Sequence, residues 1–541
     1  MKKKLFIFLI LLLGLLIRLY RLGDFPPTLY GDEQAFAWNA YNILLTGEDE
    51  YGTPYPLQFR SFNDYKAPIP VYILVPFIKI LGLNSFAIRL PVAIAGSLTV
   101  LVTYYLSRLF FKTKTSLTAS FLVAVSPWHM HLSRGYFEST LSLLWFIIGV
   151  YFYLKGKGRL LLTLLGMLFF ALSLYTYFTP RILTPFFLIF LSFYIKFLSS
   201  DSSRKIFRNI IIGVFFLFVL SLPLIRLTFF DKGLSRFNKL TETNNMIVND
   251  TVNRERYASN LPNNWRVFFH NKVTVWYRLI KNNYFEHLSI NFWYLYGDNS
   301  LRYFTGNMGM FYLIELPFFL IGLYYLLREN KNAWILFIGW ILLAPIPASL
   351  VGRSFAVRSL ALLPAPFIIT AYGLVKLLYF LKTIKMKFMI FSLAITIGYV
   401  IFLGNLLIRY YLEYPVYAAT WWGWENKAAL DYAKERESNY EKIFISDFYT
   451  GAPLAFAVYN AYDPLKFREA INNPVIMADG RVLIKLGKYY FGSLDLDKKR
   501  LDSGIIPPKS LYIARPEEAD SSETINAPDD GRIIFKVYKT P

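Results

Sequence analysis

Long apolar runs, separated by mostly short polar connections, recur along residues 1–408 of the 541-residue chain. An α-helix needs about 20 apolar residues to cross the hydrocarbon core of a bilayer, and most of these runs approach that length. The pattern therefore predicts a mainly α-helical, polytopic membrane protein. We expect about eleven spans, at residues 4–20, 87–111, 115–130, 140–154, 160–177, 182–198, 209–229, 310–327, 333–350, 356–380 and 388–408.

Two apolar runs need a separate interpretation. The opening run, MKKKLFIFLILLLGLLIRLY, has the basic head of a signal peptide, but arginines stand where a small-residue cleavage site would be expected. We interpret it as an uncleaved first span. The run PIPVYILVPFIKILGL (68–83) has 16 residues and contains three prolines and Lys79. Because it is short for a span, we expect a helix at the membrane surface or partly embedded in it.

Basic residues gather in short clusters, and these clusters set the topology. Cytoplasmic loops of membrane proteins carry an excess of lysine and arginine. If each cluster is cytoplasmic and 68–83 does not cross, the long polar connections 21–86, 131–139 and 230–309 all lie outside, together with residues 409–541. The clusters are Lys2 to Lys4; Arg108, Lys112 and Lys114; Lys155, Lys157 and Arg159; Arg204, Lys205 and Arg208; Arg328 and Lys331; and Lys382, Lys385 and Lys387.

Topology and composition together limit the function. A site on the extracytoplasmic face of the plasma membrane cannot use cytoplasmic nucleotides directly, so an activated substrate must arrive on a lipid. The chain is 55% hydrophobic and 17% charged, which is more apolar and less charged than a typical soluble protein. The topology clusters explain the net charge of +22, and without a basic arm or nucleic-acid motif we expect no nucleic acid partner. The absence of cysteine excludes thiol catalysis, disulfides and cysteine-bound metals.

Residues 409–541 have a different pattern. Short β-rich runs alternate with a helical stretch in EKIFISDFYTGAPLAFAVYNAYDP, and the chain ends with GRIIFKVYKT before its last residue. The alternation predicts a small extracytoplasmic α/β C-terminal domain after a transmembrane domain of residues 1–408. This part carries no catalytic signature.

An acidic pair, Asp32 and Glu33, follows the first span. The next residues predict a helix with an apolar face (Phe36, Ala40, Ile43 and Leu44), which suits a helix lying on the membrane. A carboxylate beside the bilayer is where a general base for a membrane-side hydroxyl would stand. In the alternative interpretation, Asp32 caps that helix and Glu33 interacts with the helix dipole.

Two further motifs lie in the outer connections. In FNDYKAPIP, Lys66 precedes the proline-rich apolar run, where its charge could neutralise a lipid phosphate or simply reach the interface as an anchor. In SPWHMHLSRGYFEST, Arg134 and Glu138 flank aromatic residues, and Glu138 could meet Asp32 at the outer surface. The alternative is an interfacial loop with an aromatic belt. His129 and His131 do not share a helix face, so we interpret them as interfacial residues rather than metal ligands.

Basic side chains also converge on the outer side. LYTYFTPRILTP, YGDNSLRYFTGNMG and VGRSFAVRSLALLPAP each place arginine at the outer end of a span, and an arginine at the membrane edge is costly without an anionic partner. Several cations facing one surface suggest a phosphate site, although each alone could be a membrane anchor. The predicted phosphate-binding residues are Lys66, Arg181, Arg302 and Arg358.

The segments YGDEQAFAWNAYNILLTG, NDYKAPIPVYILVPFIKILGLNSFAIRLPVAIAGSL and SPWHMHLSRGYFEST together resemble a known family, the GT-C glycosyltransferases. The similarity is to the bacterial, glycosyltransferase family 39-like branch related to protein O-mannosyltransferases and the lipid A aminoarabinose transferase. It is firmest over residues 1–200 and extends more loosely to about residue 380.

The resemblance implies roles for individual residues. Asp32 matches the essential first-loop acid that activates the acceptor hydroxyl, Glu33 its acidic neighbour, and Glu138 the second-loop acid. These three are the expected catalytic residues. Lys66 matches the lysine that faces the donor phosphate. The two remaining positions are basic residues near the leaving phosphate, Arg181 and Arg358.

The sequence also departs from the family pattern. KAP replaces the usual Lys-Pro-Pro, and Tyr65 stands where relatives often have glutamate, which weakens a metal-site inference. Tyr303 and Phe355 fall where histidine is expected, and Glu138 where aspartate is common. No cofactor is implied with certainty, and a divalent metal stays open.

The resemblance thus implies a membrane hexosyl- or pentosyltransferase. It would move a sugar from a polyprenyl-phosphate donor in the membrane lipid to a hydroxyl of an acceptor protein, lipid or polysaccharide, with inversion. Two alternatives stay open: a transporter or lipid flippase, and a non-catalytic sensor or scaffold. Transporters usually carry mid-membrane charges and repeats, whereas these span interiors are mostly uncharged and show no clear repeat.

Overall fold

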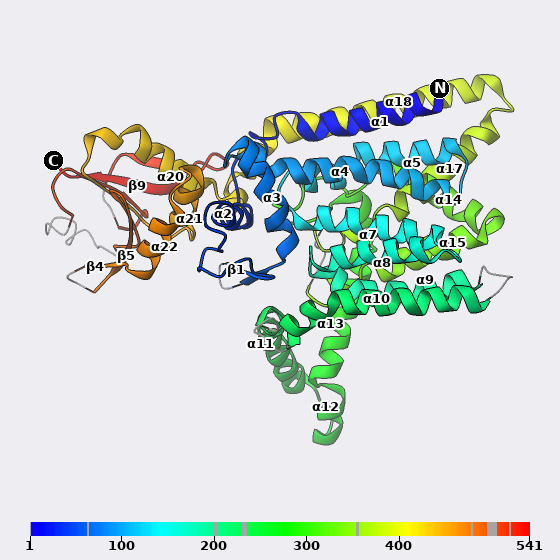
Figure 1. Ribbon diagram of the computed structural model, residues 1–541, viewed down its shortest axis with the longest axis horizontal. Helices are drawn as coiled ribbons and strands as arrows, with labels where there is room; N and C mark the ends of the chain where they lie inside the picture. Colours follow the sequence, from blue (N-terminus) through cyan, green and yellow to red (C-terminus); the bar gives the residue numbers. More distant parts are fainter. Residues whose placement is uncertain are drawn as a thin grey trace.

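Long helices run side by side and form a bundle that makes up most of the molecule (Figure 1). A layer of strands and helices from the C-terminal part lies at one end of the bundle, and a helical arm projects sideways near the same end. The computed structural model describes residues 2–61, 64–197, 203–229, 235–352, 356–477, 480–494, 506–518 and 521–541.

Every predicted span coincides with a helix of the bundle. Five described helical segments are long and apolar enough to cross a membrane, so the number of eleven crossings stays a prediction. These five are Ser85–Arg108, Thr179–Phe197, Arg204–Thr228, Lys331–Ser349 and Met386–Tyr417. The bundle helices are α1 (Lys2–Leu19), α4 (Ser85–Arg108), α5 (Thr113–Val125), α7 (Glu138–Lys155), α8 (Leu160–Leu174), α9 (Thr179–Phe197), α10 (Ser203–Phe229), α14 (Leu316–Glu329), α15 (Lys331–Leu343), α17 (Ala365–Leu381) and α18 (Lys385–Ile408).

The basic clusters lie together at one end of the bundle. The start of α1 and the α4–α5, α14–α15 and α17–α18 turns are at the end far from the C-terminal layer (Figure 1). The helices therefore alternate in direction as the charge pattern predicts. We call the end that carries the C-terminal layer the outer end; its extracytoplasmic location stays a prediction.

Glycines bring two helices of the bundle, α14 and α17, into close contact. A Cβ atom on Gly373 of α17 would collide with the carbonyl oxygen of Phe318 in α14, and one on Gly322 of α14 would collide with that of Ile369. Small residues at facing positions allow helix backbones to approach closely, which is how helices pack well where no water drives them together. These contacts hold α14 against α17.

The first outer connection folds into α2 (Gly31–Thr46), β1 (Phe59–Ser61), β2 (Asp64–Lys66) and α3 (Pro68–Leu81). Helix α3 runs across the end of the bundle rather than along it (Figure 1), as expected for a run that does not cross. The predicted surface location of α2 is wrong. Ten of the 16 residues of α2 are buried, because the helix lies between α3 and two helices of the C-terminal part, α21 (Ala452–Tyr459) and α22 (Pro464–Asn472).

The C-terminal part forms a mixed sheet of seven strands in the order β4-β5-β6-β3-β7-β9-β8. The central strand β3 pairs in parallel with β6 and β7, while the other pairs are antiparallel. The domain boundary at residue 408 stays a prediction. The elements are α20 (Trp424–Glu435), β3 (Lys442–Ile445), α21, α22, β4 (Val475–Ile476), β5 (Val482–Leu486), β6 (Tyr489–Phe491), β7 (Ser510–Ala514), β8 (Thr524–Asn526) and β9 (Ile533–Lys539).

Two hydrogen bonds join the first outer connection to residues that are far away in the sequence. The Thr28 hydroxyl donates to the carbonyl oxygen of Trp422 (2.6 Å), and the Tyr459 hydroxyl accepts from the backbone N–H of Leu29 (3.1 Å). The segment before α2 is therefore fixed by residues of the C-terminal part.

The second large outer connection forms the projecting arm. It consists of α11 (Ser235–Ala258), α12 (Asn263–Phe269) and α13 (Lys272–His287). Two short helices, α6 (Pro127–Leu132) and α16 (Ile346–Ser349), lie at outer ends of the bundle helices.

Candidate active site

Glu33 lies in the protein interior, where both of its carboxylate oxygens accept hydrogen bonds. Oε1 accepts from Arg89 Nε (2.9 Å) and from the backbone N–H of Tyr136 (2.8 Å), while Oε2 accepts from Arg89 Nη2 (3.1 Å) and the backbone N–H of Tyr30 (3.2 Å). Neither the Glu33 nor the Arg89 side chain is exposed to solvent. Since Tyr30 is the N-cap residue of α2, Glu33 fixes where this helix begins.

Two buried arginines hold the backbone that leads into α2. Arg89 Nη1 donates to the carbonyl oxygen of Pro26 (2.8 Å). Arg134 Nη1 donates to that of Ile17 (2.8 Å) and Arg134 Nη2 to that of Tyr20 (2.8 Å), at the end of α1. These bonds supply donors to carbonyl groups that have no backbone partner at the end of a helix and in a loop. Sequence reasoning missed Arg89, although an arginine inside an apolar run was the signal that could have identified it.

Asp32 does not share the environment of its neighbour. Its carboxylate is 39% exposed and accepts a hydrogen bond from the Lys66 ammonium group. Lys66 ends β2, its side chain is only 6% exposed, and its ammonium lies 5.5 Å from the centre of the Phe36 ring. Asp32 therefore forms an ion pair with the predicted phosphate-binding lysine and does not cap α2.

A small polar pocket adjoins this ion pair. Glu138 reaches it from the first turn of α7, Lys66 from the end of β2, and Arg181 from the first turn of α9. Arg181 is oriented by a hydrogen bond from its Nε to the carbonyl oxygen of Leu174 (3.1 Å). The structure thus brings Lys66, Glu138 and Arg181 together around one pocket, with Asp32 held by Lys66. The lining residues are Gln58, Tyr65, Lys66, Ala67, Glu138, Thr176, Tyr177, Phe178 and Arg181.

Tyr303 connects this pocket to the remaining predicted cations. Burial raises the pKa of the Tyr303 hydroxyl, Arg302 and Arg358 lower it, and Asp32 and Glu138 raise it. A charge shifts the pKa of a nearby group only when it lies within electrostatic reach. Four predicted site residues are therefore within electrostatic reach of this tyrosine, at a position where the resemblance led us to expect histidine.

Arg302 and Arg358 lie at the margin of the site. Arg302 Nε donates to the carbonyl oxygen of Trp421 (2.9 Å), and its guanidinium lies 5.2 Å from the centre of the Tyr30 ring. Arg358 lines a second small cavity, which shares Tyr177 with the polar pocket. Arg353 and Phe355 lie outside the described residues.

Asp298 supports the segment that carries Arg358. Its carboxylate accepts hydrogen bonds from the backbone N–H groups of Ala356 (2.5 Å) and Ser300 (2.8 Å). Burial raises the pKa of Asp298 to about 6, and the two backbone bonds and the charge of Arg358 oppose this shift. Asp298 therefore supports the site indirectly, because it holds the backbone of the loop that leads to Arg358.

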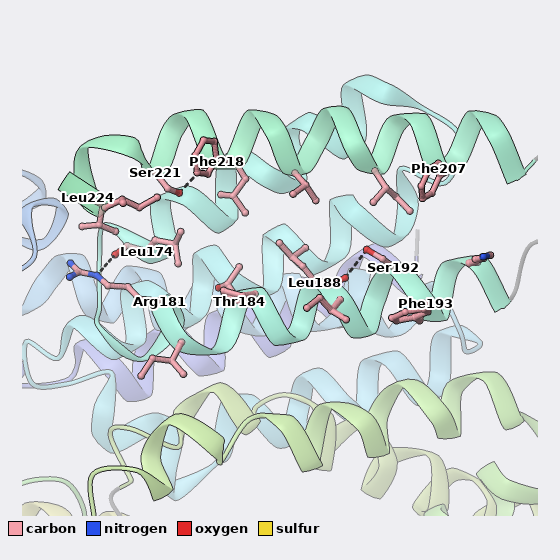
Figure 2. Close-up of a pocket in the computed structure, with 18 of the residues that line it drawn as sticks. Leu174, Arg181, Thr184, Leu188, Ser192, Phe193, Phe207, Phe218, Ser221 and Leu224 are labelled. Carbon is pink, nitrogen blue, oxygen red and sulfur yellow. Dashed lines mark hydrogen bonds between the residues drawn. The ribbon is translucent and has the colours of Figure 1, made fainter. Parts of the chain in front are cut away.

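A long apolar cleft runs between α9 and α10 (Figure 2). It has a volume of about 980 Å³, and Arg181 and Phe178 line both the cleft and the polar pocket. Figure 2 shows Arg181 near one end, with Leu188, Phe193, Phe207 and Leu224 along its length. A cleft with apolar walls along two membrane helices and a cation at its outer end suits an amphiphile with an anionic head.

The two histidines of WHMH are buried and bond to different partners. His129 Nδ1 lies 2.7 Å from Arg18 Nη2, and His131 Nε2 lies 2.9 Å from the carbonyl oxygen of Arg302. Among the described residues, no three histidine, cysteine, aspartate or glutamate side chains are grouped so that they could hold a metal ion.

Comparisons with known proteins found a family model and solved structures that resemble this chain. Residues 65–225 match the family model described as dolichyl-phosphate-mannose-protein mannosyltransferase. The structure of ArnT from Cupriavidus metallidurans bound to undecaprenyl phosphate is similar, with a TM-score of 0.51 and 11% identity over 98% of this chain and 97% of that chain. A search of curated proteins found no match.

Two other solved structures resemble the chain more distantly. The archaeal oligosaccharyltransferase AglB from Archaeoglobus fulgidus has a TM-score of 0.49 and 13% identity over 84% of this chain, which spans only 63% of AglB. The Pmt1-Pmt2 protein O-mannosyltransferase complex of S. cerevisiae has a TM-score of 0.34 and 16% identity over 42% of this chain and 33% of that chain. The fold expected from the resemblance is confirmed: the protein is a membrane protein with the GT-C fold, which it shares with the ArnT structure, and its residues 65–225 match the protein mannosyltransferase family model.

Proposed function

We propose that the protein is a membrane glycosyltransferase that moves a sugar from a polyprenyl-phosphate donor to an acceptor hydroxyl at the outer end of the bundle. The single observation that carries this proposal is the junction at Arg181. There an apolar cleft of about 980 Å³ meets a polar pocket that holds Lys66 and Glu138. A long lipid and its phosphate head need these two environments side by side. The undecaprenyl phosphate in the ArnT structure supports the same donor class.

In this mechanism, the polyprenyl chain occupies the cleft and its phosphate lies between Lys66 and Arg181. The acceptor hydroxyl attacks the anomeric carbon of the sugar as Asp32 takes its proton. The bond from that carbon to the phosphate oxygen breaks, and polyprenyl phosphate leaves with the bonding electron pair. Lys66 and Arg181 stabilise the charge that develops on the phosphate, an effect that is usually a large part of catalysis. Arg358 assists from the margin, and one displacement inverts the anomeric centre.

The ion pair between Asp32 and Lys66 gives the two substrates an order. While Lys66 binds Asp32, one oxygen of the carboxylate is occupied by the ammonium group and is not open to the acceptor hydroxyl. A donor phosphate competes for the same ammonium and leaves Asp32 open to the acceptor hydroxyl. Donor binding thus prepares the base.

The other two acidic residues, Glu138 and Glu33, have different roles in this mechanism. Glu138 faces the pocket and acts as an electrostatic partner of the cations around it. The buried environment of Glu33 supports a positioning role, holding the start of α2 and hence Asp32, in place of the direct catalytic role that the resemblance implies. Arg302 positions Tyr30 through its ring contact and binds the C-terminal part.

The test is a transfer assay with the purified protein in lipid nanodiscs. Radiolabelled undecaprenyl-phosphate sugars are offered with a cell-envelope extract as the source of acceptor. We expect the native protein to transfer label and the Asp32→Asn variant to bind undecaprenyl phosphate while losing about 10²-fold or more of the transfer rate. The matched control is Asp24→Asn, because Asp24 lies in the same connection, is 59% exposed and forms an ion pair with the exposed Arg21.

The outcomes separate the competing functions. Unchanged transfer by Asp32→Asn would contradict the assignment of the base. Binding and movement of undecaprenyl phosphate across the bilayer without sugar transfer would instead favour the flippase. An unaltered cell envelope in cells that carry Asp32→Asn would favour a non-catalytic sensor.

A further inference from the structure

The arm carries an exposed cluster of large apolar side chains that the proposed reaction does not use. Around α12, Trp265 is 57% exposed, Phe268 66% and Phe269 50%, and at the start of α13 Val273 is 76% exposed. Tyr277 follows one turn later at 68%. Contiguous apolar surface of this kind is rare on a face that meets only water.

The opposite side of the arm already has a partner. Val275, with Trp276 and Leu279 beside it, packs against Val248 and Val252 of α11. Helix α13 therefore has two apolar faces, and the described residues cover one of them. The exposed residues Val273, Tyr277 and Phe285 follow at intervals of four or eight residues, so they line the other face as a stripe along the helix.

The base of the arm is bonded to the outer end of the bundle. The Tyr284 hydroxyl donates to the carbonyl oxygen of Leu342 (2.8 Å) in the last turn of α15, and Asn283 Nδ2 donates to that of Ser349 (3.2 Å) in α16. These bonds join the base of α13 to the outer end of a helix long and apolar enough to span. From there the arm extends across the direction of the bundle helices, as Figure 1 shows, and hence along the plane of a bilayer.

The residue types on the exposed side fit a lipid surface. Tryptophan, tyrosine and phenylalanine favour the headgroup region, and basic side chains bind phosphate groups there. Arg266 lies within α12 and Lys272 begins α13, so both stand beside the aromatic cluster. Lys281 extends its ammonium to 5.9 Å from the Tyr277 ring, as lysines do when they reach from an apolar surface towards phosphates.

We propose that α12 and α13 lie in the outer headgroup layer of the membrane, with the aromatic cluster inserted among the lipids as an interfacial anchor. This inference does not depend on sugar transfer. Because the arm follows α10 directly, the anchor fixes the lipid surface next to the cleft between α9 and α10.

The test uses the full chain, in which any introduced cysteine is unique because the sequence has none. Phe268→Cys and Val273→Cys are each labelled with a nitroxide in nanodiscs of phosphatidylcholine and phosphatidylglycerol. Collisions with oxygen, which enriches in lipid, are compared with collisions with a water-soluble nickel complex. Phe215→Cys in α10, 66% exposed on the bundle, is the lipid control, and Lys466→Cys on α22 is the water control.

We expect the ratio of oxygen to nickel collisions at positions 268 and 273 to be several-fold higher than at 466 and to approach that at 215. A ratio equal to that at 466 would overturn the proposal by placing the arm in water. Low collision rates with both agents would also overturn it, because they would mean that a protein surface, such as a second copy of the chain, covers the cluster.

Discussion

Two charged regions meet at the start of α2, and they differ in almost every physical respect. In one region, Glu33 and Arg89 are fully buried, and the glutamate accepts a hydrogen bond at each oxygen. In the other, Asp32 is 39% exposed and Lys66 lines the polar pocket. The two carboxylates are adjacent in sequence, yet one is part of the interior and the other is partly exposed and pairs with a lysine that lines the polar pocket.

In the proposed mechanism, this difference separates the residues that stabilise the fold from those that take part in the reaction. A buried ion pair tolerates little change, since removal of one partner leaves an uncompensated charge in the interior. An ion pair beside a cavity can exchange its partner for a ligand. We call Glu33–Arg89 the sealed pair and Asp32–Lys66 the open pair. In the proposed mechanism, the sealed pair holds the start of α2 in place while the open pair exchanges Asp32 for the donor phosphate.

Breaking the sealed pair has the largest expected effect. Arg89→Met leaves Glu33 charged and buried and frees carbonyl groups of the preceding loop, so we expect a loss of about 3–5 kcal/mol in unfolding free energy. The measurement is thermal unfolding of the purified protein in detergent. Arg21→Met, which removes an exposed pair to Asp24, should change the unfolding free energy by less than about 1 kcal/mol. Equal losses in the two variants would contradict the distinction between the regions.

Breaking the open pair should affect activity rather than folding. Lys66→Met removes the cation expected to stabilise the leaving phosphate, so the transfer rate should fall by about 10²-fold or more while the unfolding temperature changes little. Lys79→Met is the matched control, because Lys79 is an exposed lysine at the other end of the following helix. Retained transfer in Lys66→Met would remove this lysine from the site.

Filling the apolar cleft should give a smaller effect that depends on lipid length. Ser221 lines the cleft from α10, so Ser221→Phe takes up space that a long polyprenyl chain needs. We expect about a tenfold higher KM for undecaprenyl-phosphate donors and a weaker effect on short-chain analogues, measured by initial rates. Ile211→Phe, on α10 but outside the cleft lining, is the control. The same KM change for long and short donors would argue against the cleft as the lipid site.

The smallest expected effect concerns Glu50, which lies in the first connection and accepts a hydrogen bond from Asn39 Nδ2 (3.3 Å). Burial raises the pKa of Glu50 from 4.5 to about 7, against the hydrogen bonds from Asn39 and Ser61. Between these values the folded state holds a proton that the unfolded state has lost, so the contribution of Glu50 to stability falls as pH rises.

Glu50→Gln removes this titration. Unfolding free energies of the native protein and Glu50→Gln, measured across pH 5 to 8, should show the variant gaining stability relative to the native protein as pH rises through about 7. A difference that stays constant with pH would mean that Glu50 does not titrate in this window.

The sequence predicted the arrangement of the bundle and much of the pocket. Span lengths and basic clusters were sufficient to place Lys66, Glu138 and Arg181 at one end, because these signals depend on the bilayer rather than on details of packing. Which member of the acidic pair is buried and which pairs with Lys66 could not be predicted. That choice depends on Arg89, which is 56 residues away from Glu33 and meets it only after folding.

The location of α2 shows a second limit. Apolar residues on a helix indicate burial, but they do not distinguish lipid from protein as the covering medium. Helix α2 is covered by α21 and α22, more than 400 residues later in the chain. A local pattern contains no information about a partner at that distance.

The bonds that join residues 28 and 29 to residues 422 and 459 also have a consequence for biosynthesis. The chain enters the membrane from its N-terminus, so the segment that bears Asp32 is made early and waits for almost the whole protein before its last contacts can form. Synthesis past residue 459 is therefore needed before the start of α2 can make all of these contacts, so the assembly of this segment is a late event in folding.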